Sequence, residues 1–127
     1  MLPFTIAFEK GRPAYEQVVY GVKKAILSGQ LRVNDRFPSV RQLSVELRIN
    51  PNTAQKVIAA LQQEGLLDVI PGVGTVVAKS PEATRDQRQE ILGDEVERLV
   101  VEAKRLSLEL TELQQAVARH WKRLEQK

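Results

Sequence analysis

Two helix-start signals lie close together near the middle of the chain, and they constrain the fold more than any other feature. Ser39 follows a proline, which disfavours helix before it, and can cap a helix, with Gln42 completing a capping box. Asn50 is a favoured N-cap, and Pro51 suits the first position of a helix. The first helix must therefore be short and end near residues 48–49. The sequence predicts two helices joined by a tight turn.

The second helix, expected to end near Glu64, has one apolar and one polar face. Its apolar side chains recur at helical spacing and are Ala54, Val57, Ile58 and Leu61. Such a stripe must face a core. Asn52, Gln55 and Lys56 are thereby turned outward. Asn and Gln can bond to an adenine edge, Lys to a guanine edge or a phosphate, and the Thr53 methyl group can contact thymine. This pattern favours a helix that enters a DNA major groove; the alternative is an ordinary solvated helix face.

A change of periodicity after Gly65 indicates a β-hairpin. Residues 67–70 and 75–78 are rich in β-branched side chains, and the loop between them contains Gly72 and Gly74. Glycine lets backbone amides approach a phosphate or a minor groove without a side chain between them. For Gly74 the alternative is that it only serves the turn. Helix, turn, helix and hairpin together predict a winged helix, a fold that is mainly α with a small β wing.

These motifs resemble those of the bacterial GntR-type transcription regulators. The resemblance covers residues 12–79 and is carried by Pro38-Ser39-x-Arg41-x-Leu43-Ser44, Thr53-x-x-x-Val57, Glu64-Gly65-Leu66-Leu67 and Gly72-x-Gly74-Thr75. The run Asn50-Pro51-Asn52-Thr53 is similar to the YtrA-like subgroup. The chain differs from many members at Pro51 and Gln55, where arginine is common, at Arg48 in the turn, and at Val76 in the wing. These differences concern the operator sequence more than DNA binding itself.

The resemblance implies a winged helix-turn-helix DNA-binding domain over residues 12–80. By analogy with the family, DNA contacts fall at Arg41, Asn52, Thr53, Gln55 and Gly72, with Lys56 as the natural cation of the YtrA-like subgroup. The full set of candidate DNA-binding residues is Ser39, Arg41, Asn52, Thr53, Gln55, Lys56, Gly72 and Gly74.

The segments before the helix pair complete this domain. Residues 14–28 carry apolar side chains at helical spacing and precede Gly29, which predicts a first helix. Residues 31–37 can supply a short strand beside the wing, with Asn34 in a left-handed turn. Residues 4–8 alternate like an edge strand.

A separate two-helix tail is expected over residues 81–127. Residues 83–106 resemble one long amphipathic helix interrupted only by Gly93, and Ser107 or Thr111 could cap a second helix. Two such helices cannot bury their apolar faces alone, so we expect them to pack against the same pair in a second subunit. Such a tail resembles the dimerisation region of YtrA-like regulators. The alternative is that it folds back onto its own winged helix.

Composition and charge agree with a small regulator and argue against an enzyme. The chain has 127 residues, no cysteine, and one histidine, His120, without further residues at metal-ligand spacing, so we expect no catalytic site, metal or cofactor. No apolar run is long enough to span a bilayer and no signal peptide is recognisable, which favours a cytoplasmic protein. Residues 13–80 hold eight Lys/Arg against five Asp/Glu, and residues 81–127 hold nine against ten. This modest excess predicts that two copies are needed for tight DNA binding.

We therefore expect a sequence-specific DNA-binding transcription regulator that binds double-stranded DNA at a pseudo-palindromic operator as a homodimer. A repressor is favoured, and an activator is the alternative. A winged helix that binds another protein, and a small RNA-binding module, are the alternatives. The short tail leaves little room for a pocket of ~300 Å³ or more. Any small-molecule effector would therefore bind between subunits, or between the tail and the winged helix.

Overall fold

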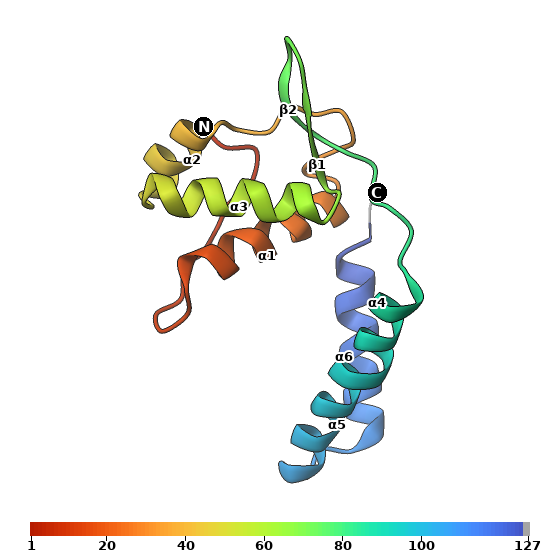
Figure 1. Cartoon of the computed structure of the whole chain (residues 1–127). Helices are drawn as coiled ribbons and strands as arrows, with labels where there is room; N and C mark the ends of the chain where they lie inside the picture. Colours follow the sequence, from red (N-terminus) through yellow and green to blue (C-terminus); the bar gives the residue numbers. More distant parts are fainter. Residues whose placement is uncertain (126–127) are drawn as a thin grey trace. The chain divides into compact units, whose positions relative to one another are not determined.

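The computed structural model describes residues 1–125, and its helices and strands fall into two units. The first unit, Met1–Pro81, contains α1 (Ala14–Leu27), α2 (Val40–Leu47), α3 (Pro51–Gln63), β1 (Leu67–Ile70) and β2 (Gly74–Val77). The second unit, Glu82–Leu124, contains α4 (Arg85–Gln89), the π-helical segment η1 (Glu90–Glu95), α5 (Val96–Arg105) and α6 (Leu110–Arg123) (Figure 1). The predicted fold class, mainly helical with a small β wing, is confirmed.

The core of the first unit lies between α1, α2, α3 and the hairpin. The apolar stripe predicted for α3 is buried, with Ala54, Val57 and Leu61 at 0% exposure and Ile58 at 6%. Burial of each large apolar side chain contributes roughly 1.5–3 kcal/mol. The partners of this stripe include Val18, Val22, Leu43, Leu67 and Val77. Because the stripe fixes the rotation of α3 about its axis, the opposite face of that helix must be solvent-exposed.

The caps predicted for α2 and α3 are present. The Ser39 hydroxyl oxygen accepts a hydrogen bond from the Gln42 amide at 3.1 Å, and Asn50 Oδ1 accepts one from the Asn52 amide at 2.7 Å. The reciprocal half of the capping box expected at Gln42 is not observed. Between the helices the backbone is left-handed at Arg48, with φ 56°. This residue makes the tight turn.

The hairpin forms as predicted, except that its second strand begins one residue earlier, at Gly74, and ends at Val77. The connection that precedes α2 joins it at one point. Leu67 pairs with Val77 and Ile70 pairs with Gly74 in antiparallel register. The strand expected over residues 31–37 is reduced to a single bridge between Arg36 and Val76. The reason is local, because Asn34 is left-handed at φ 76° and interrupts the extended backbone.

The edge strand expected over residues 4–8 does not form. Phe4 is buried and its ring stacks on Phe37 with centroids 5.9 Å apart, while Ile6 contacts the surface of α1 at Gly21. The alternation of apolar side chains therefore serves to dock an irregular segment onto the helices, and not to extend the sheet.

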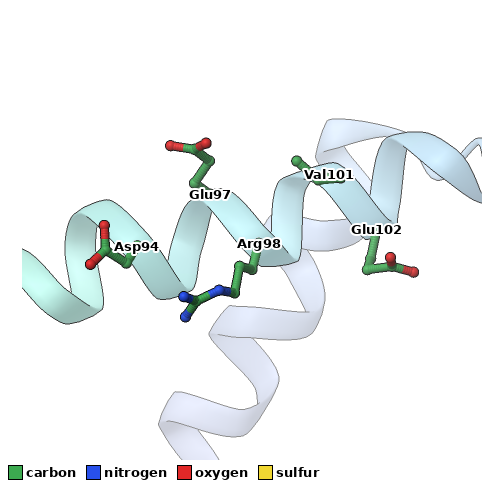
Figure 2. A pocket seen from close by; sticks show the side chains of 5 residues that line it. All are labelled: Asp94, Glu97, Arg98, Val101 and Glu102. Atoms are coloured by element: carbon green, nitrogen blue, oxygen red, sulfur yellow. The ribbon is translucent and has the colours of Figure 1, made fainter.

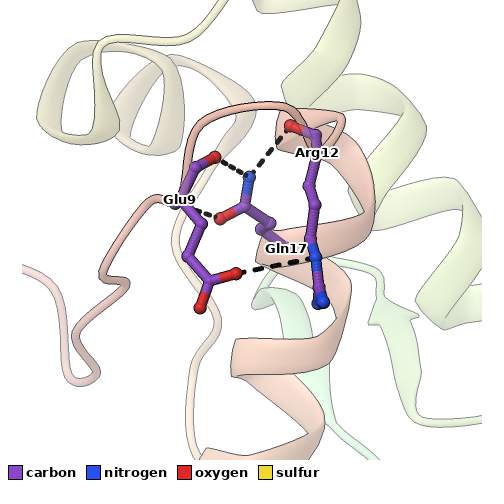
Figure 3. A network of polar contacts seen from close by, with 3 residues as sticks. All are labelled: Glu9, Arg12 and Gln17. Atoms are coloured by element: carbon purple, nitrogen blue, oxygen red, sulfur yellow. Dashed lines mark hydrogen bonds and ion pairs between the residues drawn. The ribbon is translucent and has the colours of Figure 1, made fainter.

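A polar network closes the turn between this segment and α1 (Figure 3). The Gln17 side chain accepts a hydrogen bond from the Glu9 amide at 2.6 Å and donates to the carbonyl oxygens of Glu9 and Arg12, both at 3.0 Å. Arg12 Nε also lies 3.5 Å from a Glu9 carboxylate oxygen. Three bonds from a single side chain thus hold the loop against the start of α1.

The tail helices differ in detail from the sequence prediction. Thr84 forms a full capping box with Gln87 at the start of α4, and the helix passes through the π-helical turn η1 around Gly93 before α5. The cap of α6 is Glu109, with Glu112 completing the box, so the expectation of Ser107 or Thr111 was wrong. Ser107 is instead left-handed, with φ 61°, and ends the preceding helix.

Most apolar side chains of the second unit are exposed. Ala103 is buried, and Val100 and Leu113 are half-buried. The exposed ones are Ile91, Leu92, Val96, Leu99, Val101, Leu106, Leu108, Leu110, Val117 and Trp121. A surface this rich in large apolar side chains is typical of an interaction site. We call this set the tail apolar surface.

Candidate nucleic-acid interface

The first turns of α3 present a polar face to solvent. Asn52, Gln55 and Lys56 are exposed, and Thr53 is half-buried beside them. Their direction follows from the buried stripe on the opposite side of the helix, and the Asn50 cap fixes where the helix begins. Amide and ammonium groups at the start of a helix that follows a tight turn are suited to the edges of bases in a major groove.

The start of α2 adds a hydroxyl and a cation. Ser39 and Arg41 are both exposed. The Ser39 oxygen already accepts the capping bond, which leaves its proton free to donate to an acceptor such as a phosphate. Within residues 1–125 Arg41 forms no ion pair. Lys23, by contrast, is paired with Glu64 at 2.8 Å, so its charge is partly neutralised.

The wing tip is shaped by its glycines. Gly72 has φ 80° and Gly74 has φ 111°, conformations that side-chain-bearing residues rarely adopt, and both residues are exposed. A Cβ atom at either position would meet no atom within 4 Å, so backbone geometry rather than crowding requires glycine here. The Val73 amide donates to the Ile70 carbonyl at 3.0 Å and closes the loop. The tip thus exposes backbone with little side-chain cover.

One surface cleft connects the wing with the start of α2. It has a volume of about 560 Å³, within the range of small-ligand sites, and its lining includes Arg36, Ser39, Gln42, Val73 and Gly74. Of the eight predicted residues, Ser39 and Gly74 line it, while the residues of α3 do not. Arg36 and Gln42 were missed by the sequence reasoning. The sequence gives no local signal for them, because the cleft is lined by residues that lie far apart in the chain, at 1–3, 36–42 and 73–75.

An acidic residue on α2 forms an ion pair within the first unit. The Met1 amine lies 2.9 Å from Glu46 Oε1. The hydrogen bond from this amine, followed by the bond from Gln42, holds the pKa of the Glu46 carboxyl below its ordinary value. Glu46 is therefore a charged but paired carboxylate.

A second cleft, on the tail, has the opposite chemistry. It measures about 400 Å³ and is lined by Asp94, Glu97, Arg98, Val101 and Glu102 (Figure 2). Arg98 is itself paired with Glu95 at 2.8 Å. The excess of carboxylates disfavours a phosphate or a nucleic acid at this position.

The described residues contain neither a metal-binding cluster nor a membrane-spanning helix. In the described part of the chain no group of three or more His, Cys, Asp or Glu side chains is arranged to hold a metal ion. His120 is exposed, with its Nδ1 3.0 Å from an Arg123 guanidinium nitrogen. None of the helices within residues 1–125 is both long and apolar enough to cross a bilayer.

Comparison with known proteins agrees with this geometry. The family described as "Bacterial regulatory proteins, gntR family" matches residues 14–77. The HTH-type transcriptional repressor YtrA of Bacillus subtilis (strain 168) is 29% identical over 102 residues, which span 80% of this chain and 78% of that protein.

Two solved structures show how far the likeness extends. A transcriptional antiterminator from Listeria monocytogenes EGD-e has a TM-score of 0.79 at 21% identity, covering 92% of this chain and 88% of its own; at this identity only the fold is shared. AraR(DBD) in complex with operator ORX1 has a TM-score of 0.52 at 26% identity, covering 58% of this chain and 95% of its own. From the matched family and the YtrA relative together, the chain belongs to the GntR family of bacterial transcription regulators and is YtrA-like within it.

Proposed function

We propose that this chain is a cytoplasmic repressor that binds a pseudo-palindromic operator as a homodimer. The observation that carries the proposal is the exposed polar face of α3, held outward by a stripe whose members are at most 6% exposed. A helix fixed in this way loses little freedom on docking, because its side chains are already presented in one direction.

The proposed contacts divide into base reading and backbone gripping. Asn52 and Gln55 would bond to base edges, with the Thr53 methyl group against a thymine. Lys56 and Arg41 would bind phosphate or a guanine edge, and Ser39 would donate to a phosphate. The exposed backbone at Gly72 and Gly74 would follow the minor groove or the adjacent phosphates. In this assignment residues 12–80 form the DNA-binding domain.

Two relatives support the proposal. AraR(DBD) was solved in complex with an operator, and its likeness to this chain falls on a region the size of the winged helix. YtrA, the relative that matches 80% of this chain, is named as a repressor.

The tail, residues 81–127, is proposed to join two copies; residues 126–127 of it lie outside the described part. The tail apolar surface contains Trp121 at 73% exposure and Leu92 at 65%, far more than a solvated helix pair needs. A two-fold interface would cover it with the same surface of a second copy. Two α3 helices held in this way would enter major grooves about one helical turn, ~34–36 Å, apart.

The test is footprinting of the purified protein on duplex DNA from upstream of its own gene. We expect two protected half-sites related by a dyad, and binding that weakens steeply with added salt. A protein-binding winged helix would give no protection at low salt. An RNA-binding module would be displaced from the duplex by competitor RNA at equal concentration, and either result would overturn the proposal.

A further inference from the structure

The cleft between the wing and α2 differs in charge from two other surface clefts within residues 1–125, one beside α1 and one on the tail. Among its lining residues Arg36 has the one charged side chain and none has a carboxylate; the Met1 amine also lines the cleft but is already paired with Glu46 at 2.9 Å. The cleft beside α1 is lined by Glu9 and Glu16 as well as by cations, and the tail cleft is mainly acidic. A negatively charged ligand is therefore favoured at the first of these positions alone. We call it the wing cleft.

The backbone around Arg36 is fixed to the wing. Arg36 pairs with Val76 in a β-bridge, and the Phe37 amide donates to the Thr75 carbonyl at 2.8 Å. On the other side, the Val77 amide donates to the Asp35 carbonyl at 2.8 Å. Arg36 is thus held by hydrogen bonds on both sides, so that its side chain leaves from a rigid position.

The side chain of Arg36 has no competing partner. It is exposed, and no ion pair involves it anywhere in residues 1–125. Arg12, Arg98 and Arg105, by comparison, each lie within 3.5 Å of a carboxylate oxygen. An arginine that is rigidly based, unpaired and free of neighbouring carboxylates in its cleft can bind an anion without first breaking an internal bond.

We propose that the wing cleft receives a phosphate of the DNA backbone and that Arg36 binds it. The inference rests on the proposed DNA-binding function. At 560 Å³ the cleft admits a sugar–phosphate segment, with Ser39 on its α2 side and Gly74 on its wing side. The phosphate contact joins the wing and the helix pair to the same DNA strand, and it carries no sequence information of its own.

The test compares Arg36→Gln with a matched control, Arg32→Gln. Arg32 is an exposed arginine of the same connection, but it does not line the wing cleft. Affinity is measured against salt concentration, for the operator and for an unrelated duplex of equal length. For Arg36→Gln we expect affinity to fall by the same factor on both duplexes. The slope of log affinity against log salt concentration should fall in magnitude by about 0.9 per protomer. Arg32→Gln should leave the slope unchanged, and circular dichroism of both variants should match the parent protein.

The outcomes separate this inference from the proposed function. If the parent protein binds both duplexes with equal affinity, the proposed operator recognition is wrong. The salt slope of Arg36→Gln still tests whether the cleft binds a phosphate. An unchanged slope in Arg36→Gln, or an equal change in Arg32→Gln, overturns the inference while operator binding stands. Absence of duplex binding by the parent protein overturns both. A last experiment uses inorganic phosphate alone. If millimolar phosphate protects Arg36 from an arginine-specific reagent, while Arg36→Gln leaves DNA affinity unchanged, the cleft binds a free anion and the inference is overturned.

Discussion

Gln55 and Arg36 represent two kinds of contact that a single substitution can separate. Gln55 lies on the exposed face of α3, where an amide can make a bidentate bond to a base. Gln55→Ala should lose roughly 1–3 kcal/mol at one base pair and relax the preference there. Selection from a randomised operator library measures this directly. Gln63 is an exposed glutamine at the other end of α3, and Gln63→Ala is the control, which should leave the base preference intact. A uniform loss over all sequences would show that Gln55 does not read bases.

The left-handed residue in the turn gives a prediction about stability. Arg48 has φ 56° and ψ 47°, a conformation that disfavours any residue with a Cβ atom. Arg48→Gly should therefore raise the free energy of unfolding by roughly 0.5–1 kcal/mol, in urea denaturation at constant m-value. Val45→Gly, at an exposed position inside α2, should lower it by a similar amount, because glycine destabilises a helix interior. Destabilisation by Arg48→Gly would contradict the argument.

At the scale of elements, the helix pair was predictable because its signals are local. Ser39 and Asn50 cap the helices that follow them, and Pro51 occupies the first turn of α3, so a few adjacent residues determine each boundary. Residues 4–8 show the opposite case. Alternation alone does not distinguish a strand from a segment whose apolar side chains dock onto helices. Only the positions of Phe37 and Gly21 in the folded unit decide between them.

Docking of the first residues should contribute measurably to stability. Phe4 is 4% exposed and stacks on Phe37. Phe4→Ala should lower the free energy of unfolding by about 3 kcal/mol, since truncation of a buried aromatic leaves a cavity. Chemical denaturation followed by circular dichroism measures the loss. Phe8→Ala is the matched control, because Phe8 is 44% exposed, and should change stability by no more than ~0.5 kcal/mol. Equal effects of both variants would mean that the segment is not docked.

For the whole molecule, the tail apolar surface leads to a prediction about assembly. Leu99 lies on α5 and is 46% exposed. Leu99→Glu would bury a charge in the proposed interface, so sedimentation should give a species near 14.3 kDa instead of twice that mass. Operator affinity should fall by about 10²-fold or more as the second half-site is lost. Glu97→Gln, a polar exchange on the same helix, should preserve both properties. A parent protein that is monomeric at micromolar concentration would contradict the dimer.

The candidate site was predictable from the sequence in part only. The polar face of α3 follows from helical spacing, because one buried stripe determines what the other side exposes. Arg36 could not be found in this way. Its importance depends on a cleft built from the wing and α2, and on the absence of carboxylates there, which are properties of the folded unit.

The π-helical turn at Glu90–Glu95 has a consequence for how related sequences should be compared. A π turn holds about one residue more than an α turn, so that Ile91 and Val96, five positions apart, lie on one side of the helix. Loss of a single amino acid near Gly93 would restore regular α-helical winding without rotating the preceding turns against α5. Alignments of this region should therefore tolerate a one-position gap there. The same gap within α5 would turn its apolar side chains by ~100° and disrupt the tail apolar surface.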